Sequence, residues 1–218
     1  DYTKYALELV NFYGLLRHCL VFTGWQSGVK LYWDTGDADI FLEDLWIDVN
    51  PKTDGYGEHL RLEAAAEAGL TNIRIDKLHT TTPGTTRTDK ALVLSLINWV
   101  EAYKLYLEGW LNWAVVLDEA NENVLSFAQG GTAKISVKGS KNLIISENKV
   151  DIQASYVEGN YNRFVFNRIC NYDNFGPSIG VNDAYGSAST RSIATGAKMA
   201  WRTISQVVIA LSGVASGE

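Results

Sequence analysis

The sequence predicts an all-β fold, a sandwich or barrel with short helices near the N-terminus and in the connections. The composition is that of a globular protein, with 46% hydrophobic and 20% charged residues among 218. Short apolar-alternating segments separated by polar turns favour many strands rather than βαβ units. Seven Trp and eleven Tyr suit a sandwich core or extensive subunit contacts. At this length, one domain spanning residues 1–218 is expected.

The first third of the chain begins with an apolar pattern that suits a helix through Ala6–Leu16. A turn then leads into a strand over Val29–Trp33, followed by a polar loop. A second strand is predicted over Ile40–Val49, and its irregular pattern indicates a bulge.

The middle third is predicted to contain a short helix over residues 62–70, ending at Gly69. In the alternating segment that follows, we expect Ile73, Ile75 and Leu78 to point inward. Residues 80–89 are predicted to be an exposed loop. Residues 92–113 are consistent with strands or a buried helix by periodicity, and we favour strands.

The C-terminal part carries a series of short alternating segments and no visible internal repeat. A Gly/Ser/Asn/Asp-rich loop is predicted over residues 171–196. Strands are predicted at Val124–Phe127, Ala133–Val137, Leu143–Ile145, Val150–Tyr156, Phe164–Cys170 and Lys198–Gly213. In the fourth of these, Val150, Ile152, Ala154 and Tyr156 should share one face.

Charge and cysteine content exclude several functions. A net charge of −6 and a pI near 5.1 leave no basic face for reading nucleic acid. Cys19 and Cys170 have no zinc-ligand spacing, and they are either two free thiols or one disulfide. No glycosylation sequon and no apolar run of about 18 residues occur. The chain begins at Asp1 rather than Met, which suggests processing or trimming.

One acidic loop contains two patterns that are known from functional sites. Asp34-Thr35-Gly36 is the tripeptide of aspartic proteases, but no second copy supplies the partner carboxylate, so a hairpin loop is expected. Asp34, Asp37 and Asp39 could hold a calcium ion, although the spacing lacks a distal Glu and a solvated loop is favoured.

No other pattern predicts catalysis. His18, His59 and His79 lie in separate segments without neighbouring metal ligands, and neither a hydrolase elbow nor a phosphate loop is present. Residues 159–168 partly resemble the RNA-recognition-motif octapeptide, but the acidic balance favours packing around a corner at Glu158–Asn160. The sequence therefore predicts a non-enzyme, with no catalytic, cofactor-binding or metal-binding residues and no cofactor.

Three segments, taken in order, resemble the jelly-roll capsid proteins of picornavirus-like viruses. Residues 13–33 are similar to the family's helix-then-strand, with an aromatic, Trp, Ser and Gly turn. Val150-Asp151-Ile152 with Tyr156 and Arg163-Phe164 are similar to a charged strand and corner, although Gln153 replaces the usual Pro. Residues 200–215 are similar to the family's long terminal strand, although Ser205 and Gln206 replace its Gly-Asp pair.

The resemblance implies an eight-stranded antiparallel jelly-roll β-sandwich that acts as a structural coat subunit of a non-enveloped icosahedral RNA virus. Its partners would be further copies and homologous coat subunits, with weak contact between the inner surface and genomic RNA. It would reside in the virion after assembly in the host cytoplasm. The family's N-terminal arm and first strand have no counterpart here, and residues 50–123 match nothing in it.

Two other functions stay open. The alternative is a secreted or surface β-sandwich that binds a glycan or a protein, with Trp25, Trp33, Trp46 or Trp201 as an exposed stacking platform. Packing in a core or interface is the competing role for each of these rings. An enzyme on a β scaffold would require a pocket with convergent titratable groups.

Overall fold

The computed structural model describes residues 5–23, 25–34, 39–65, 72–128, 132–151, 156–170, 178–179, 182–188 and 199–202. These ranges contain strands and no helix, and therefore no apolar helix of a length that crosses a bilayer. The strands are β1 Tyr5–Val10, β2 Gly14–Thr23, β3 Ser27–Trp33, β4 Ile40–Asn50, β5 Glu58–Ala64, β6 Ile73–Thr81, β7 Thr88–Ser95, β8 Val100–Leu107, β9 Trp110–Asp118, β10 Val124–Ala128, β11 Thr132–Ala133, β12 Ile135–Lys138, β13 Leu143–Asp151, β14 Tyr156–Glu158, β15 Arg163–Cys170, β16 Ser178–Ile179, β17 Asn182–Ala188 and β18 Met199–Arg202.

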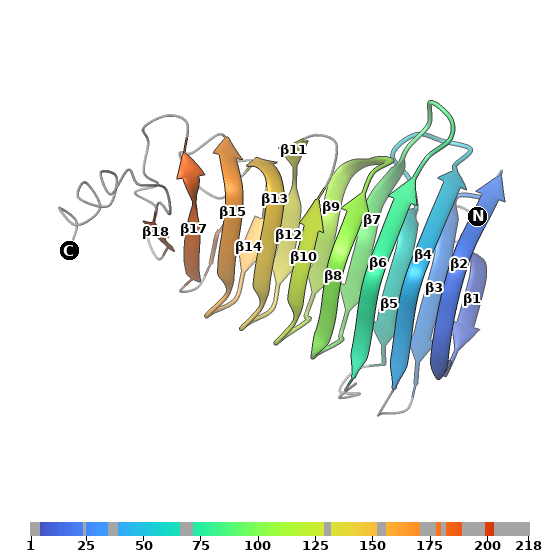
Figure 1. Cartoon of the computed structure of the whole chain (residues 1–218), viewed down its shortest axis with the longest axis horizontal. Helices are drawn as coiled ribbons and strands as arrows, with labels where there is room; N and C mark the ends of the chain where they lie inside the picture. Colours follow the sequence, from blue (N-terminus) through green and yellow to red (C-terminus); the bar gives the residue numbers. More distant parts are fainter. Residues whose placement is uncertain are drawn as a thin grey trace.

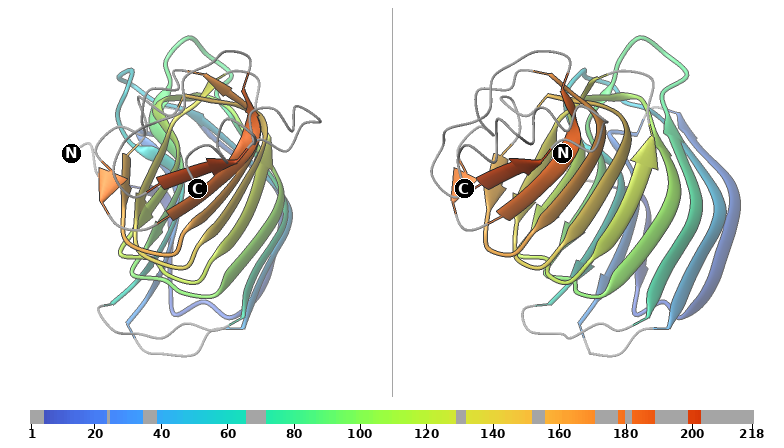
Figure 2. Two further views of the ribbon diagram at one scale, coloured as in Figure 1. Left: turned by 90° about the vertical axis from the view of Figure 1, so that its left-hand side faces the viewer. Right: turned by 60° about the vertical axis from the view of Figure 1, so that its left-hand side comes forward.

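The strands belong to two sheets between which the chain alternates. One sheet has the order β1-β3-β5-β7-β9-β12-β14-β16, and the other has the order β18-β17-β15-β13-β10-β8-β6-β4-β2. Neighbouring strands are parallel, as in β3 with β5 and β4 with β6. The chain is therefore a solenoid whose coils stack along the long axis (Figure 1). Turned views show the chain passing from one sheet to the other in successive coils (Figure 2).

The antiparallel eight-stranded jelly roll predicted from the sequence is wrong. All of the strand pairings described are parallel and join strands of successive coils. Alternation of apolar and polar residues arises wherever one face of a strand is buried, so it does not distinguish a parallel coil from an antiparallel hairpin. The all-β content is confirmed, but the topology is not.

Coil length varies along the chain, which explains why no repeat is visible in the sequence. In the first sheet, 31 residues separate the paired residues Val29 and Leu60, whereas 20 separate Val137 and Val157. Most of the difference lies in the connections, and several strand pairs also shift register by one residue. A repeat of fixed period is the usual sequence signal of a solenoid, and this chain lacks one.

The helix predicted over Ala6–Leu16 is wrong, because this segment forms parts of β1 and β2. Between them, Asn11 has a φ of 51° and Gly14 has a φ of 109°, a backbone that no right-handed helix contains. The helix predicted over residues 62–70 also fails, because its first three residues belong to β5. Residues 66–70 lie outside the described part of the chain.

Most of the predicted strands are confirmed, including strands in the ambiguous segment over residues 92–113. The predicted corner at Glu158–Asn160 separates β14 from β15. The loop predicted over residues 171–196 is partly wrong, since β16 and β17 lie within it. Of the predicted strand Lys198–Gly213, the structure describes β18. The predicted strand Val150–Tyr156 is wrong as one strand with a shared face, because Val150 belongs to β13 in the second sheet and Tyr156 begins β14 in the first; Ile152 and Ala154 lie outside the described residues.

The core lies between the sheets and consists of apolar columns that run along the solenoid. Val29, Leu60, Leu92, Val115 and Ile135 pair in register and are completely buried. Strand spacing of about 4.8 Å brings each side chain into contact with its equivalent in the next coil. The inward positions predicted for Ile73, Ile75 and Leu78 are confirmed, because each is at most 1% exposed.

Each strand of the second sheet that lies between β2 and β10 is bent by one residue in a left-handed backbone conformation. Asp44, Lys77 and Lys104 occupy equivalent positions and have φ values of 48°, 66° and 54°. The residue before each of them is also turned outward, so alternation is interrupted; in β4, both Glu43 and Asp44 lie between the buried Leu42 and Leu45. The irregular burial confirms the bulge predicted in β4. Asp44, Lys77 and Lys104 line up across the three strands where each strand bends outward, and we call this line the convex edge.

Stacked asparagines hold the corner between the two sheets. Asn142 Oδ1 accepts hydrogen bonds from the backbone and side chain of Asn123, both at 3.0 Å. Asn162 Oδ1 accepts the same two bonds from Asn142, at 3.0 and 2.9 Å. Each amide group also donates to a backbone carbonyl, as Asn142 does to Ala120 at 3.0 Å. The three side chains are at most 1% exposed, and their bonds add to the backbone bonds that join successive coils at this corner, such as Leu143 N to Asn123 O at 2.8 Å.

Candidate functional site

Three aromatic side chains form a row on the outer face of the second sheet. Trp46 on β4, His79 on β6 and Tyr106 on β8 are paired across neighbouring strands. The ring centroids of Trp46 and His79 are 4.0 Å apart, and those of His79 and Tyr106 are 4.9 Å apart. In-register parallel stacking therefore brings together residues that are 33 and 27 positions apart in the chain. We call these residues the aromatic row.

Two carboxylates, Asp48 and Glu108, flank the aromatic row. The Trp46 indole Nε1 donates to Asp48 Oδ1 at 2.8 Å. Glu108 interacts with Tyr106, and its Oε2 lies 3.9 Å from His79 Nε2. The interaction with Glu108 raises the pKa of Tyr106, because a neighbouring carboxylate favours the protonated phenol. Asp48 thus orients the indole ring of Trp46, and Glu108 lies at the other end of the row.

His79 lies between the two outer rings and is neutral at neutral pH. Desolvation by its neighbours lowers the pKa of His79, and the negative charges of Glu108 and Asp48 oppose this effect. Its flanking rings remain open to solvent, with Trp46 43% and Tyr106 40% exposed. The aromatic row therefore offers flat apolar surfaces edged by carboxylate acceptors.

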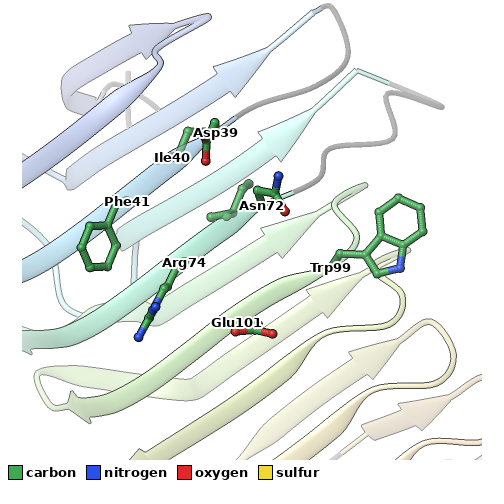
Figure 3. A pocket seen from close by; sticks show the side chains of 8 residues that line it. Asp39, Ile40, Phe41, Asn72, Arg74, Trp99 and Glu101 are labelled. Carbon is green, nitrogen blue, oxygen red and sulfur yellow. The ribbon is translucent and has the colours of Figure 1, made fainter.

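A second feature is a hollow on the outer face at the opposite ends of β4, β6 and β8 (Figure 3). Its volume is about 560 Å³. Phe41, Arg74 and Glu101 pair across the three strands and form its floor. It is completed by Asp39, Ile40, Asn72, Ile73 and Trp99, of which Asn72 and Trp99 have left-handed backbones.

A charged network on the first sheet has a structural arrangement. Glu58, whose side chain is 8% exposed, accepts bonds from Tyr5 at 2.7 Å, Arg61 at 3.1 Å and Lys90 at 3.1 Å. Burial, followed by the charge of Glu58, raises the pKa of Tyr5. Because each donor already has its acceptor, this network does not present a free group to a ligand.

The histidines and the acidic loop are dispersed by the fold. His59 is completely buried, where its ring nitrogens bond to Thr88 Oγ1 and Thr81 O, each at 2.8 Å. Asp34 bonds to Asn11 at 2.6 Å, whereas Asp39 lines the hollow and Asp37 lies outside the described residues. Within the described ranges, no three His, Cys, Asp or Glu side chains are grouped to hold a metal ion.

The four candidate tryptophans have different environments. Trp46 belongs to the aromatic row, and Trp25 is 44% exposed in the connection after β2. Trp33 is wrong as a platform, because it is completely buried and its Nε1 donates to Phe12 O at 2.9 Å. Trp201 lies on β18, and its side chain is outside the described part of the structure.

The two cysteines are too far apart for a disulfide within the chain. Cys19 lies on β2 and Cys170 on β15, which are six strand spacings apart in the same sheet. At about 4.8 Å per spacing, this places their backbones on the order of 29 Å apart. A disulfide requires Cα atoms within about 7 Å.

Sequence reasoning missed the partners of Trp46. Asp48, His79, Tyr106 and Glu108 come together only when coils of unequal length are aligned. The sequence does contain one sign of stacked coils. Asn123, Asn142 and Asn162 recur at intervals of 19 and 20 residues, and each lies at the corner between the two sheets in its own coil. Comparison of the chain with profiles of known families, with curated proteins and with solved structures finds no match in any of the three.

Proposed function

We propose that this protein is a glycan-binding module whose aromatic row receives a sugar ring. The observation that carries the proposal is the pair of exposed rings, Trp46 and Tyr106, which strand pairing aligns on either side of His79, with Trp46 also bonded to Asp48. The face of a pyranose carries C–H groups with partial positive charge, which are attracted to the negative face of an aromatic ring. Sugar hydroxyl groups are hydrogen-bond donors that match carboxylate acceptors.

The charge of the site favours a neutral glycan. Asp48 and Glu108 flank the aromatic row, and the whole chain carries a net charge of −6. A polyanionic chain would be repelled by both. Orientation of the rings before binding also lowers the entropy lost when the sugar is bound.

The coat-subunit function implied by the sequence resemblance remains a prediction, and the parallel solenoid offers it no support. The absence of enzymatic activity also remains a prediction. A glycan-binding function draws on Trp46, which the sequence already singled out, and on neighbours that the fold adds to it.

The proposal is tested with immobilised neutral polysaccharides: glucans, mannans, galactans and xylans. We expect the protein to be retained by at least one of them. Trp46→Ala and Tyr106→Ala should each weaken binding about 10- to 100-fold, as expected for a central aromatic contact. Tyr161→Ala is the matched control, because Tyr161 is 72% exposed at the corner before β15 and should not change binding. Retention by none of the polysaccharides, or unchanged affinity of both row variants, would refute the proposal.

A further inference from the structure

The hollow at the other ends of β4, β6 and β8 combines groups that a sugar ligand requires. Phe41 and Trp99 contribute apolar rings, and Trp99 is 46% exposed. Arg74 can only donate hydrogen bonds, whereas the ionised carboxylates of Asp39 and Glu101 can only accept them. Concave sites with apolar walls and a few convergent polar groups are the usual form of small-ligand sites.

Charge pairing distinguishes the hollow from the surface around it. The convex edge next to it is neutralised, because Asp44 pairs with Lys77 and Lys104 pairs with Asp76 at 2.9 Å. Arg74 and Glu101 are paired in the strand register, yet within the described ranges neither forms an ion pair. Arg74 and Glu101 therefore line the hollow without an ion-pair partner among the described residues (Figure 3).

The Arg74 guanidinium is also held in position by its neighbour. Its central carbon lies 5.5 Å from the centroid of the Phe41 ring, as in a cation–π contact. This contact leaves the edge of the guanidinium, with its five N–H donors, free to bind hydroxyl groups. Two carboxylates line the same hollow, so an anionic ligand would be repelled, whereas a neutral polyol satisfies both the donors and the acceptors.

We infer that the hollow is a second subsite for the same neutral polysaccharide, which crosses the convex edge to reach it from the aromatic row. This inference rests on the proposed function. Phe41 and Trp46 are five residues apart on β4, a backbone distance of at most about 17 Å. A polymer bound at one subsite is therefore present at high effective concentration at the other, whereas a disaccharide cannot occupy both.

The test compares a polysaccharide retained in the panel with its own disaccharide, measured by calorimetry on the full chain. Arg74→Met and Trp99→Ala should each weaken binding of the polysaccharide at least about 10-fold. In the variant Trp46→Ala, the residual affinity for polysaccharide and disaccharide should become similar, because avidity is lost. Tyr161→Ala is again the control, and circular dichroism checks that each variant keeps its strand content.

Each outcome decides between the two proposals. If Arg74→Met and Trp99→Ala bind the polysaccharide as the parent chain does while Trp46→Ala does not, the hollow is no subsite and the aromatic row acts alone. If the hollow variants lose binding and Trp46→Ala does not, the proposed function of the row is refuted and the hollow is a separate site. If no neutral polysaccharide binds, both proposals fail.

Discussion

Replacement of Asn142 by alanine tests whether the stacked asparagines hold the solenoid in register. The change removes the acceptor for the backbone N–H and side-chain amide of Asn123, each bonded at 3.0 Å. It also removes the donor that bonds to the carbonyl of Ala120 at 3.0 Å. These groups are buried at the corner, and of the three only the Asn123 side-chain amide has a second bond among the described residues, to Ile97 O at 3.2 Å.

The cost follows from the number of groups left without a partner. A buried donor or acceptor that loses its hydrogen bond costs about 1–3 kcal/mol. Three such groups give a loss of roughly 3–9 kcal/mol in the free energy of unfolding, which is a large part of the usual 5–15 kcal/mol. Because coils of a solenoid contact only their neighbours, the effect should be greatest in the adjacent coils.

The measurement is urea denaturation followed by circular dichroism, together with hydrogen exchange. Asn112→Ala is the matched control, since Asn112 is exposed and makes one bond of 2.6 Å to Asp89. We expect the control to lose no more than about 1 kcal/mol. Exchange at the backbone N–H of Asn123 should be faster in Asn142→Ala. Equal losses in the two variants, with unchanged exchange, would contradict the role given to the asparagines.

Three further predictions concern the packing of the solenoid. Burial holds the pKa of His59 at about 4, below its usual 6.5, so the free energy of unfolding should fall by about 2 kcal/mol between pH 7 and pH 5 as the unfolded state gains a proton. In urea denaturation, His59→Gln should lose about 2 kcal/mol less over this pH range than the parent chain. An equal loss in both would refute the lowered pKa of His59. Glu58→Gln should lower the free energy of unfolding by about 2–3 kcal/mol, because Arg61 and Lys90 each lose one of their two carboxylate partners. A variant as stable as the parent would show the network to be dispensable. Gly159→Ala should lower Tm far more than Gly14→Ala. Both glycines have positive φ, but only at Gly159 would the added Cβ lie 1.9 Å from a carbonyl oxygen, that of Gly139. Equal decreases in Tm would contradict the tight packing of this corner.

Much of the fold was predictable from the sequence because strands and core positions follow from local alternation. Ile73, Ile75 and Leu78 were correctly placed inside, and the irregular pattern of β4 correctly indicated a bulge. Direction of pairing was not predictable, since a buried face produces the same alternation in parallel and antiparallel strands. At the N-terminus, apolar residues fill nearly every position from Tyr5 to Leu16, so the helical and strand periods both fit.

The candidate site was less predictable than the fold. Trp46 was identified as a candidate platform from residue type alone, but so was Trp33, which proved to be buried. Strict alternation from Ile40 and Leu42 would place Trp46 in the core, but the bulge at Asp44 in β4 turns its side chain outward. His79 and Tyr106 join Trp46 through coils of 33 and 27 residues, and no local pattern specifies such unequal lengths.

The most direct test of the glycan-binding account is a titration followed by the indole N–H resonances of the seven tryptophans. An oligosaccharide of the polysaccharide retained in the panel is added to ¹⁵N-labelled protein, with Trp46→Phe used to assign the Trp46 signal. The account predicts that the Trp46 resonance shifts, because its Nε1–H is bonded to Asp48 beside the bound sugar, while the buried Trp33 resonance stays in place. A saturating titration that leaves the Trp46 resonance unmoved would contradict it.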